Sequence, residues 1–382
     1  MVIVQLTTDN RWQFQEYHKP IPWFGPAPEA LLQGFAGLAD LEVHVVSCTQ
    51  KPMMASPEKL ADNIWFHSLH VPTIGWLRTG YQGCIRAVRK KLKEIQPDIV
   101  HGTGTERDCS ISAIFSGFPN VITIHGNMAD LARIARARIG SFHWLTARLE
   151  DFTLPRTAGV LCNSVYTENL VRPRARKIWR IPHALRQAFF VPANAASLPK
   201  PPACVLLNVG TVLPLKHQNE LLDVAEQLHA EGLSFELHFA GTASAKDPYA
   251  ARFLGRFKNR PHLFWDGYKS IDEIIAQYDR STALVHVSAA ESFGLVVAEA
   301  LSRNLKFFGF NSGGVLDIAT GVEGAELFEY GDWPGLKSSI ARWIRSGFPR
   351  PETAARVMRG RYYPDEIARR HMEVFREVLN LH

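Results

Sequence analysis

The sequence predicts an α/β protein made of two doubly wound domains with parallel sheets. Short apolar, β-branched runs alternate with helical segments along the whole chain, as in parallel strands joined by crossover helices. The 382 residues are too many for one ordinary core and suit two domains. A Pro/Ala-rich stretch without strand character, residues 191–202, separates the halves and is the expected linker. We therefore expect domains over 1–190 and 203–355, followed by a helical C-terminal segment over 356–382.

The first half contains seven expected strands, each a short apolar run bounded by polar or Gly-containing segments. They cover residues 2–6, 43–47, 64–67, 97–102, 120–126, 159–163 and 177–181. Helices are expected at 29–38 and 81–95, and further helices begin near Asn127, Met128 and Asp130 and at Ser164. The alternation of these elements is what predicts a parallel sheet in this half.

A long segment rich in aromatic residues, 7–28, follows the first strand. It contains Trp12, Phe14, Tyr17, Trp23 and Phe24. Loops of this length are commonly functional or disordered. Its aromatic side chains are expected either to stack on a sugar or to pack the core beneath.

The second half restarts the same pattern after the linker. Strands are expected at 204–210, 235–240, 263–267, 283–287 and 305–310, and helices at 220–229, 295–303 and 331–345. Residues 362–382 form an amphipathic helix with Ile367, Met372, Phe375 and Val378 on one stripe. That stripe predicts a helix packed on a core.

The composition is that of a globular protein without a disulfide framework. Hydrophobic residues make up 46% and charged residues 21%, and no apolar run approaches the ~18 residues of a membrane span. The N-terminal residues lack a basic segment before their apolar run, so we expect no secretory signal. Five scattered cysteines, without a C-x-x-C or Cys/His cluster, predict a reduced cytoplasmic protein and no metal site.

Positive charge is concentrated in three clusters. The net charge is +6 and the pI about 9.1. The clusters are Arg86, Arg89, Lys90, Lys91 and Lys93; Arg133, Arg136, Arg138 and Arg148; and Arg172, Arg174, Arg176 and Lys177. Each alone is typical of a solvated helix face, but together they suit a phosphorylated substrate or an anionic membrane surface. No nucleic-acid-binding motif accompanies them, so nucleic acid is not an expected partner.

The most informative stretch is 285–314, VHVSAAESFGLVVAEALSRNLKFFGFNSGG. It reads as strand, loop, helix, strand, turn, with both loops at carboxyl ends of strands, where open parallel sheets bind ligands. Amides from Gly294 onward begin a helix, and such a terminus suits a phosphate. Glu291 before it and Glu299 two turns along can accept hydrogen bonds from hydroxyls. A diphosphate flanked by two hydroxyl-rich rings is a nucleotide-sugar.

The same string resembles the E-x7-E signature of retaining glycosyltransferases of family 4, also called group 1. The resemblance covers residues 204–345 well and the first half loosely. It implies a GT-B fold, in which two Rossmann-like domains face each other across a cleft and the last helix crosses back to the first domain. The first domain would hold the acceptor and the second the donor, which we expect to be a UDP- or GDP-sugar used as substrate, with no cofactor.

The resemblance also assigns donor-binding residues in the second half. Gly210, Thr211 and Lys216 are similar to the family's diphosphate-binding loop, although Thr211 replaces its usual basic residue. Without the resemblance, Lys216 would be a solvated lysine at a helix start. Phe293, Gly294, Leu295 and Val296 would present amides to the diphosphate, Glu299 would bind the ribose, and Tyr268 would meet the base. Glu291 would orient the donor sugar, so Lys216, Glu291 and His125 are the expected catalytic residues.

In the first half, the family places a histidine facing the donor sugar where this chain has His125. A structural hydrogen bond is the alternative role for a histidine at a strand end. His183-Ala184 stands where the family usually has Asn-Gly, and the paired glycines of the acceptor loop are absent. Gly102-x-Gly104 begins a dinucleotide fingerprint but has Arg107 at the third glycine, so no nicotinamide site is expected.

The predicted function is metal-independent hexosyl transfer, with retained configuration, to a glycan, lipid-linked or small-molecule acceptor. The enzyme is expected in the cytoplasm with peripheral membrane contact. A glycosidase is disfavoured because Glu299, inside a helix after a phosphate-type loop, is poorly placed as its second carboxylate. A nucleotide-sugar epimerase and a non-catalytic nucleotide-sugar-binding protein of the same fold remain the alternatives.

Overall fold

The computed structural model describes residues 1–54, 56–191 and 204–380. The chain forms two compact units, one of Met1–Arg186 with the chain from Tyr362 onward, and one of Gln187–Arg361. The first unit therefore starts the chain and also ends it. Most of the expected linker, 191–202, lies outside the described residues.

Eight strands form the sheet in the described part of the first unit. Their order is β3-β4-β2-β1-β5-β6-β7-β8. All neighbouring pairs are parallel except β3 with β4. The strands are β1 (Val2–Leu6), β2 (Glu42–Thr49), β3 (Lys59–Ala61), β4 (Ile64–His70), β5 (Ile99–Thr103), β6 (Asn120–Ile124), β7 (Gly159–Cys162) and β8 (Ile178–Arg180). The antiparallel edge strand β3 was not predicted.

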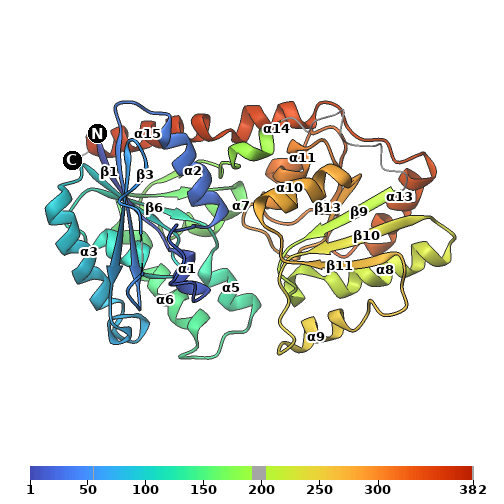
Figure 1. Cartoon of the computed structure of the whole chain (residues 1–382), viewed down its shortest axis with the longest axis horizontal. Helices are drawn as coiled ribbons and strands as arrows, with labels where there is room; N and C mark the ends of the chain where they lie inside the picture. The colour runs from blue at the N-terminus through green and yellow to red at the C-terminus, as the bar shows by residue number, and fades with distance from the viewer. Residues whose placement is uncertain (55, 192–203, 381–382) are drawn as a thin grey trace. The chain divides into compact units, whose positions relative to one another are not determined.

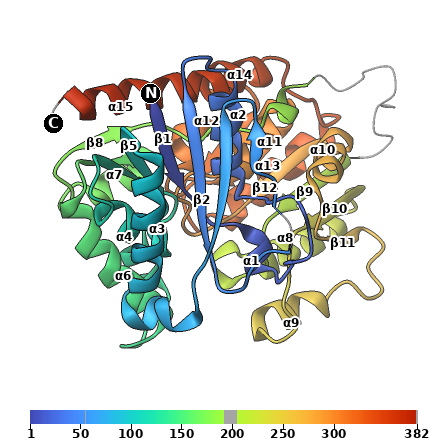
Figure 2. The ribbon, with the colours of Figure 1, turned by 60° about the vertical axis from the view of Figure 1, so that its left-hand side comes forward.

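Helices cover both faces of this sheet because alternate strand residues point to opposite sides. Val4 packs with apolar residues of α3 (Gln82–Ile95) and α4 (Asp108–Ile114), which Figure 2 shows on one side of β1 and β2. Ile3 packs with residues of α2 (Pro26–Ala36) and α15 (Pro364–Asn380), which lie side by side in Figure 1. The stripe predicted on the last helix is buried there. The remaining helices are α1 (Asn10–Gln13), α5 (Met128–Ile134), α6 (Phe142–Thr153) and α7 (Val165–Val171).

The aromatic segment after β1 is held by a buried arginine rather than by its aromatic residues alone. Arg11 is fully buried, pairs with Asp9 at 2.7 Å and donates to the carbonyl of Lys19 at 2.8 Å. Phe24 is buried against Phe66. Of the two roles expected for these aromatic residues, Phe24 therefore has the second, packing in the core.

Within the described part of the second unit, six parallel strands form a sheet in the order β11-β10-β9-β12-β13-β14. They are β9 (Cys204–Val209), β10 (Phe235–Ala240), β11 (Leu263–Gly267), β12 (Ala283–His286), β13 (Lys306–Phe310) and β14 (Ala325–Phe328). The order reverses direction between β9 and β12. Open sheets of this kind bind ligands at the carboxyl ends of such a strand pair.

One face of this second sheet carries α8 (Gln218–Ala230), α9 (Pro248–Leu254) and α13 (Trp333–Arg345), whose apolar residues share a core with β9 and β10. The other helices are α10 (Ile271–Arg280), α11 (Leu295–Ser302), α12 (Val315–Ala319) and α14 (Ala354–Tyr362). Helix α11 follows β12 and precedes β13, as predicted. Helices α1, α4 and α6 of the first unit and α9 and α10 of the second were not predicted.

The boundary between the units lies slightly before the predicted residue 190. The short 3-10 helix Gln187–Phe190 belongs to the second unit, where Phe189 is fully buried with its ring edge-on to Tyr278. Arg303 donates to the carbonyl of Phe189 at 3.3 Å. The predicted fold class, α/β with two parallel-sheet domains, is confirmed.

Candidate active site

Two loops at the carboxyl edge of the second sheet are joined into one structure. Residues 210–217 follow β9, and residues 287–294 follow β12. The amide of Ala289 donates to the carbonyl of Leu215 at 2.8 Å, and the hydroxyl of Ser288 donates to the same carbonyl at 3.3 Å. Gln218 braces the first loop by donating to the carbonyl of Thr211 at 3.1 Å. Residues about 75 positions apart in the sequence therefore meet at this edge.

This meeting brings Lys216 and Glu291 together as an ion pair. The ring Nε2 of His286, the last residue of β12, lies 3.1 Å from the same carboxylate oxygen. Burial by itself raises the pKa of Glu291, but the charge of Lys216 and the hydrogen bond from His286 outweigh it and lower the pKa to about 2. Burial lowers the pKa of His286. The site thus contains an ionised carboxylate, an ammonium and a neutral imidazole that donates from Nε2.

The turn after β13 packs against the backbone of the Glu291 loop and holds it in place. The amide of Gly314 donates to the carbonyl of Glu291 at 2.8 Å. A Cβ atom on Gly314 would lie 2.4 Å from the carbonyl oxygen of Ser292, and one on Gly313 would lie 2.0 Å from that of Glu291. Only glycine allows this close approach of the two backbones. The S-G-G turn after the second strand is therefore part of the construction of the site.

Gly294 is the N-cap of α11 and has a φ of 99°, a conformation that side-chain-bearing residues rarely adopt. It turns the chain so that α11 starts four residues after Glu291. The first amides of a helix have no partner inside the helix and carry part of its positive dipole. Leu295 and Val296 supply these amides, while Phe293 is buried beneath them. The geometry suits an anion next to Lys216.

Glu299 lies apart from this pair, inside α11. It is 6% exposed, and the hydroxyl of Tyr278 on α10 donates to its Oε2 at 3.1 Å. Tyr278 is fully buried. The two glutamates of the motif therefore have different surroundings: Glu291 faces a lysine and Glu299 a tyrosine.

The remaining predicted donor residues lie on neighbouring loops. Gly210 directly follows β9, and Thr211 is exposed with its hydroxyl 3.0 Å from that of Thr242. Tyr268 follows β11 and is 68% exposed. Neither Thr211 nor Tyr268 contacts Lys216 or Glu291 among the described contacts.

His125 belongs to the first unit and directly follows β6. Its Nδ1 lies 3.3 Å from Nε2 of His183, and the two rings are 5.0 Å apart. Its Nε2 is buried and has no hydrogen-bond partner among the described residues. Burial lowers the pKa of both histidines. The pair is therefore neutral. One of its members, His183, belongs to the His183-Ala184 dipeptide that replaces the family's usual Asn-Gly.

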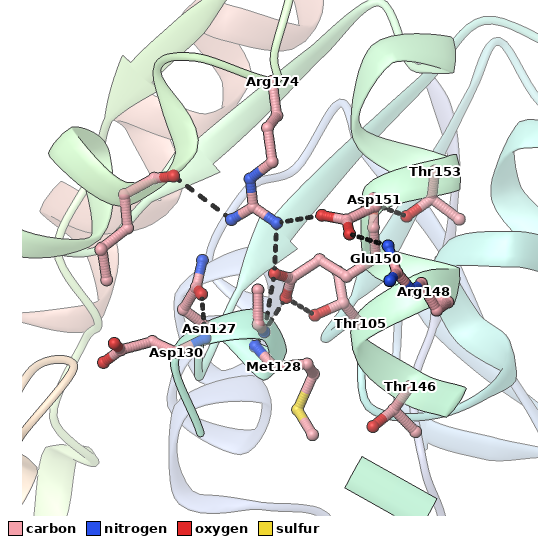
Figure 3. Close-up of polar contacts among 12 residues, drawn as sticks. Thr105, Asn127, Met128, Asp130, Thr146, Arg148, Glu150, Asp151, Thr153 and Arg174 are labelled. Atoms are coloured by element: carbon pink, nitrogen blue, oxygen red, sulfur yellow. Dashed lines mark hydrogen bonds and ion pairs between the residues drawn. The ribbon is translucent and has the colours of Figure 1, made fainter. Parts of the chain in front are cut away.

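A buried carboxylate braces the same edge of the first sheet. Glu150 on α6 is fully buried and accepts from the amide of Met128 at 2.8 Å, from the hydroxyl of Thr105 at 2.7 Å and from Arg174 at 2.9 Å. Figure 3 shows its carboxylate at the centre of these contacts. Thr105 follows β5 and Met128 begins α5, so Glu150 ties together the loops that flank His125. Asn127, at the predicted start of a helix, is the N-cap of α5 and accepts from the amide of Asp130 at 2.8 Å.

Sequence reasoning missed His286, His183 and Glu150 as site residues. His286 had a usable signal, because it ends a strand five residues before Glu291. Glu150 had no signal, because its partners lie at positions 105, 128 and 174 and its own helix was not predicted.

One group of described residues has the composition of a metal site: Cys48, Cys84 and Asp108 in the first unit, all buried. A hydrogen bond with Cys84, together with burial, raises the pKa of the Cys48 thiol well above its ordinary value. Burial raises the pKa of Asp108 to about 6. The two thiols are therefore protonated at neutral pH, and the three groups do not join the residues described above. No helix in the described chain is both long and apolar enough to cross a membrane.

Comparison with solved structures shows the fold. Sucrose-phosphate synthase from Thermosynechococcus elongatus superimposes with a TM-score of 0.78 at 15% identity, over 100% of both chains. HepE from Anabaena, in complex with UDP-glucose, gives 0.70 at 16% identity over 99% of this chain and 100% of that one. The lipopolysaccharide outer core galactosyltransferase WaaB gives 0.66 at 17% identity over 99% and 100%. These are GT-B proteins, so the chain has the GT-B fold.

Comparison with family models covers both halves of the chain. Residues 30–186 match the model described as Glycosyltransferase Family 4, and residues 193–359 match the model described as Glycosyl transferases group 1. A search of curated proteins gives no significant match. The two matching segments lie one in each half and together span most of the sequence. The chain is therefore a glycosyltransferase of group 1.

Proposed function

We propose that this glycosyltransferase moves a hexose from a UDP- or GDP-sugar to a hydroxyl of a glycan or lipid-linked acceptor, with retention of anomeric configuration. The observation that carries the proposal is the Lys216–Glu291 pair beside the first amides of α11. A nucleoside diphosphate is an anion, and an ammonium beside a helix N-terminus is suited to it. HepE, which shares the fold, was solved with UDP and with UDP-glucose.

The leaving nucleoside diphosphate gains negative charge as the glycosidic bond breaks. Lys216 and the amides of Gly294, Leu295 and Val296 stabilise that charge more in the transition state than in the ground state. The hydroxyl of Thr211 adds a neutral donor at the same edge. These groups supply the positive potential at the phosphates, so the proposed reaction does not use a metal ion.

The two glutamates have separate roles in this proposal. Glu291 is ionised at neutral pH because its pKa is about 2, so it is a strong acceptor for sugar hydroxyls. Glu299 accepts from the ribose hydroxyls while Tyr278 fixes its carboxylate from α10. Tyr268, exposed after β11, stacks on the base. His125 contacts the transferred sugar, and the acceptor hydroxyl attacks from the face that the phosphate leaves.

The acceptor side of the proposal rests on charge. The three basic clusters belong to the first unit, where Arg133, Arg136 and Arg138 end α5 and enter the following loop. They favour an acceptor that carries phosphate or lies at an anionic membrane surface. The test is vesicle co-sedimentation at low salt. Equal binding to neutral and anionic vesicles would remove this part of the proposal.

The test of the donor site is calorimetric titration of UDP, GDP and ADP into the wild type, Glu299→Ala and Lys337→Ala. We expect one nucleotide to bind, with affinity lowered by Glu299→Ala and unchanged by Lys337→Ala. Lys337 is a suitable control because it lies on α13 and pairs with Glu231, the residue that follows the far end of α8. Binding without turnover across many acceptors would favour the non-catalytic alternative, and an altered nucleotide-sugar formed without acceptor would favour the epimerase. If no nucleotide binds, the proposal fails.

A further inference from the structure

Three polar side chains at the edge of the first sheet form a hydrogen-bonded series. Asn163 follows β7, His183 lies after β8, and His125 follows β6. Nδ2 of Asn163 lies 2.9 Å from Nε2 of His183, which in turn lies 3.3 Å from Nδ1 of His125. Because each contact needs one donor and one acceptor, the position of the protons can be derived from the first member onward.

The orientation of the Asn163 amide is fixed by backbone carbonyls. Its Nδ2 lies 3.2 Å from the carbonyl oxygen of Ile124 and 3.4 Å from that of His125. Carbonyl oxygens only accept, so the atom facing them must be the NH2 group. The hydroxyl of Thr167, 3.0 Å from Oδ1, is placed to donate to the other end of the amide. The NH2 group is therefore the atom that faces His183.

The tautomers of the two histidines follow from this orientation. A donating NH2 requires an unprotonated Nε2 on His183, so that ring carries its proton on Nδ1. The same unprotonated Nε2 faces Nδ1 of His125, which must then be an N–H. Burial lowers the pKa of His125 despite the nearby carboxylate of Glu106, so the ring is neutral. Its Nε2 is left as a lone pair, buried and without a partner among the described residues.

We propose that His183, oriented by Asn163, is a positioning residue that holds His125 in the Nδ1–H tautomer, so that Nε2 of His125 is solely a hydrogen-bond acceptor for a ligand hydroxyl. The identity of that ligand as a sugar rests on the proposed function. The tautomer itself does not.

This arrangement has a consequence for specificity. A buried lone pair accepts from a hydroxyl, whereas a carboxylate at the same position would place two acceptors against each other. The site therefore selects a sugar with a hydroxyl over one with a carboxylate where His125 makes contact. UDP-glucose and UDP-glucuronate differ in this way at one carbon, so their affinities test whether the contact is made at that carbon.

The first test is nitrogen NMR of histidine-labelled protein, with the His125 signals assigned from His125→Gln. In the wild type we expect a pyrrole-type Nδ1 and a pyridine-type Nε2. His183→Gln should preserve this pattern because the amide oxygen can accept from Nδ1–H, whereas His183→Phe should lose it. His229→Phe, which disrupts the stacked pair of His229 and His262 in the second unit, is the matched control and should change nothing. A protonated Nε2 in the wild type, or an unaltered pattern in His183→Phe, would overturn the proposal.

The second test compares binding of UDP, UDP-glucose and UDP-glucuronate. We expect His183→Phe to reduce the affinity gained from the glucose, relative to UDP alone, by up to about tenfold, as for one hydrogen bond, and His183→Gln to restore it. Binding of UDP itself should not change. Equal affinity of the wild type for the two sugars would contradict a contact of His125 at the carbon where they differ. If no nucleotide binds to the wild type, the proposed function fails, and the NMR result still decides the tautomer.

Discussion

In each unit the polar residues lie at the carboxyl edge of that unit's mainly parallel sheet, yet the chemistry of the two edges differs. The second unit has an ion pair, Lys216 with Glu291, beside a helix N-terminus. The first unit has a neutral pair, His125 with His183, braced by the buried Glu150. Parallel strands fix where loops end, but the loop residues decide which charges gather there. The fold supplies the position, and the loops supply the chemistry.

The units also differ in how far apart along the chain their site residues lie. His286, Glu291, Gly294 and Gly314 of the second unit fall within one strand–helix–strand segment. The residues of the first edge come from positions 105, 125, 150, 163 and 183. A contiguous site leaves a readable motif in a sequence, and a dispersed one does not.

The largest expected effect tests the charged edge. Lys216→Ala should lower the rate of sugar transfer by about 10²–10³-fold, because one preorganised donor to the developing charge is lost. Steady-state kinetics with a fixed donor would measure it. Lys337→Ala, which removes another salt-bridged lysine of the same unit, should leave the rate within about twofold. Comparable rates for the two variants would mean that the charged edge is not where the reaction occurs.

The next effect tests the brace of the neutral edge. Glu150→Gln should lower the free energy of unfolding by about 3 kcal/mol, because Arg174 loses a buried charged partner and one of the two backbone amides that donate to the carboxylate must face an NH2 group. Urea unfolding followed by tryptophan fluorescence would measure it. Asp151→Asn removes the other, more exposed partner of Arg174 and should cost below about 1 kcal/mol. Equal costs would show that burial does not distinguish the two carboxylates.

A smaller effect tests the glycine support of the charged edge. Gly314→Ala should cost about 1–3 kcal/mol, because its Cβ would lie 2.4 Å from a carbonyl oxygen and displace the Glu291 loop. Nucleotide affinity should fall with it. Gly360→Ala in α14, where a Cβ meets nothing within 4 Å, is the control and should leave stability equal or slightly higher. Unchanged nucleotide affinity in Gly314→Ala would separate the turn from the site.

The smallest effect concerns pH. The pKa of Glu291 is about 2, below the ordinary 4.5, so its ionised form contributes stability that is present above about pH 4.5 and is lost as the pH falls toward 2. The difference in unfolding free energy between wild type and Glu291→Gln should therefore be constant from about pH 8 to pH 5. This difference in unfolding free energy should become smaller only below about pH 5. A difference that changes near pH 6 would show that Lys216 does not hold the carboxylate ionised.

Much of the second unit was predictable because its signals are local. The short apolar runs predicted β10 and β11 at their observed bounds, and β12, α11 and β13 within a residue at either end. The first unit was less complete. Strand β3 is only three residues long, and α6 begins after the basic loop with a Ser141 cap that was not recognised. Short or weakly patterned elements form because tertiary packing completes them.

The sequence alone determined the two-domain α/β fold, the Glu291–Gly294 loop and its helix, and a candidate lysine at position 216. These depend on periodicity and on glycine conformation, which are properties of neighbouring residues. Only the tertiary structure decided that Lys216 pairs with Glu291, that Glu299 faces Tyr278, and that His125 faces His183. Those contacts join strand ends that are adjacent in the sheet but distant in the chain. The order of the strands in each sheet, which no local sequence pattern encodes, determines which of these residues become neighbours.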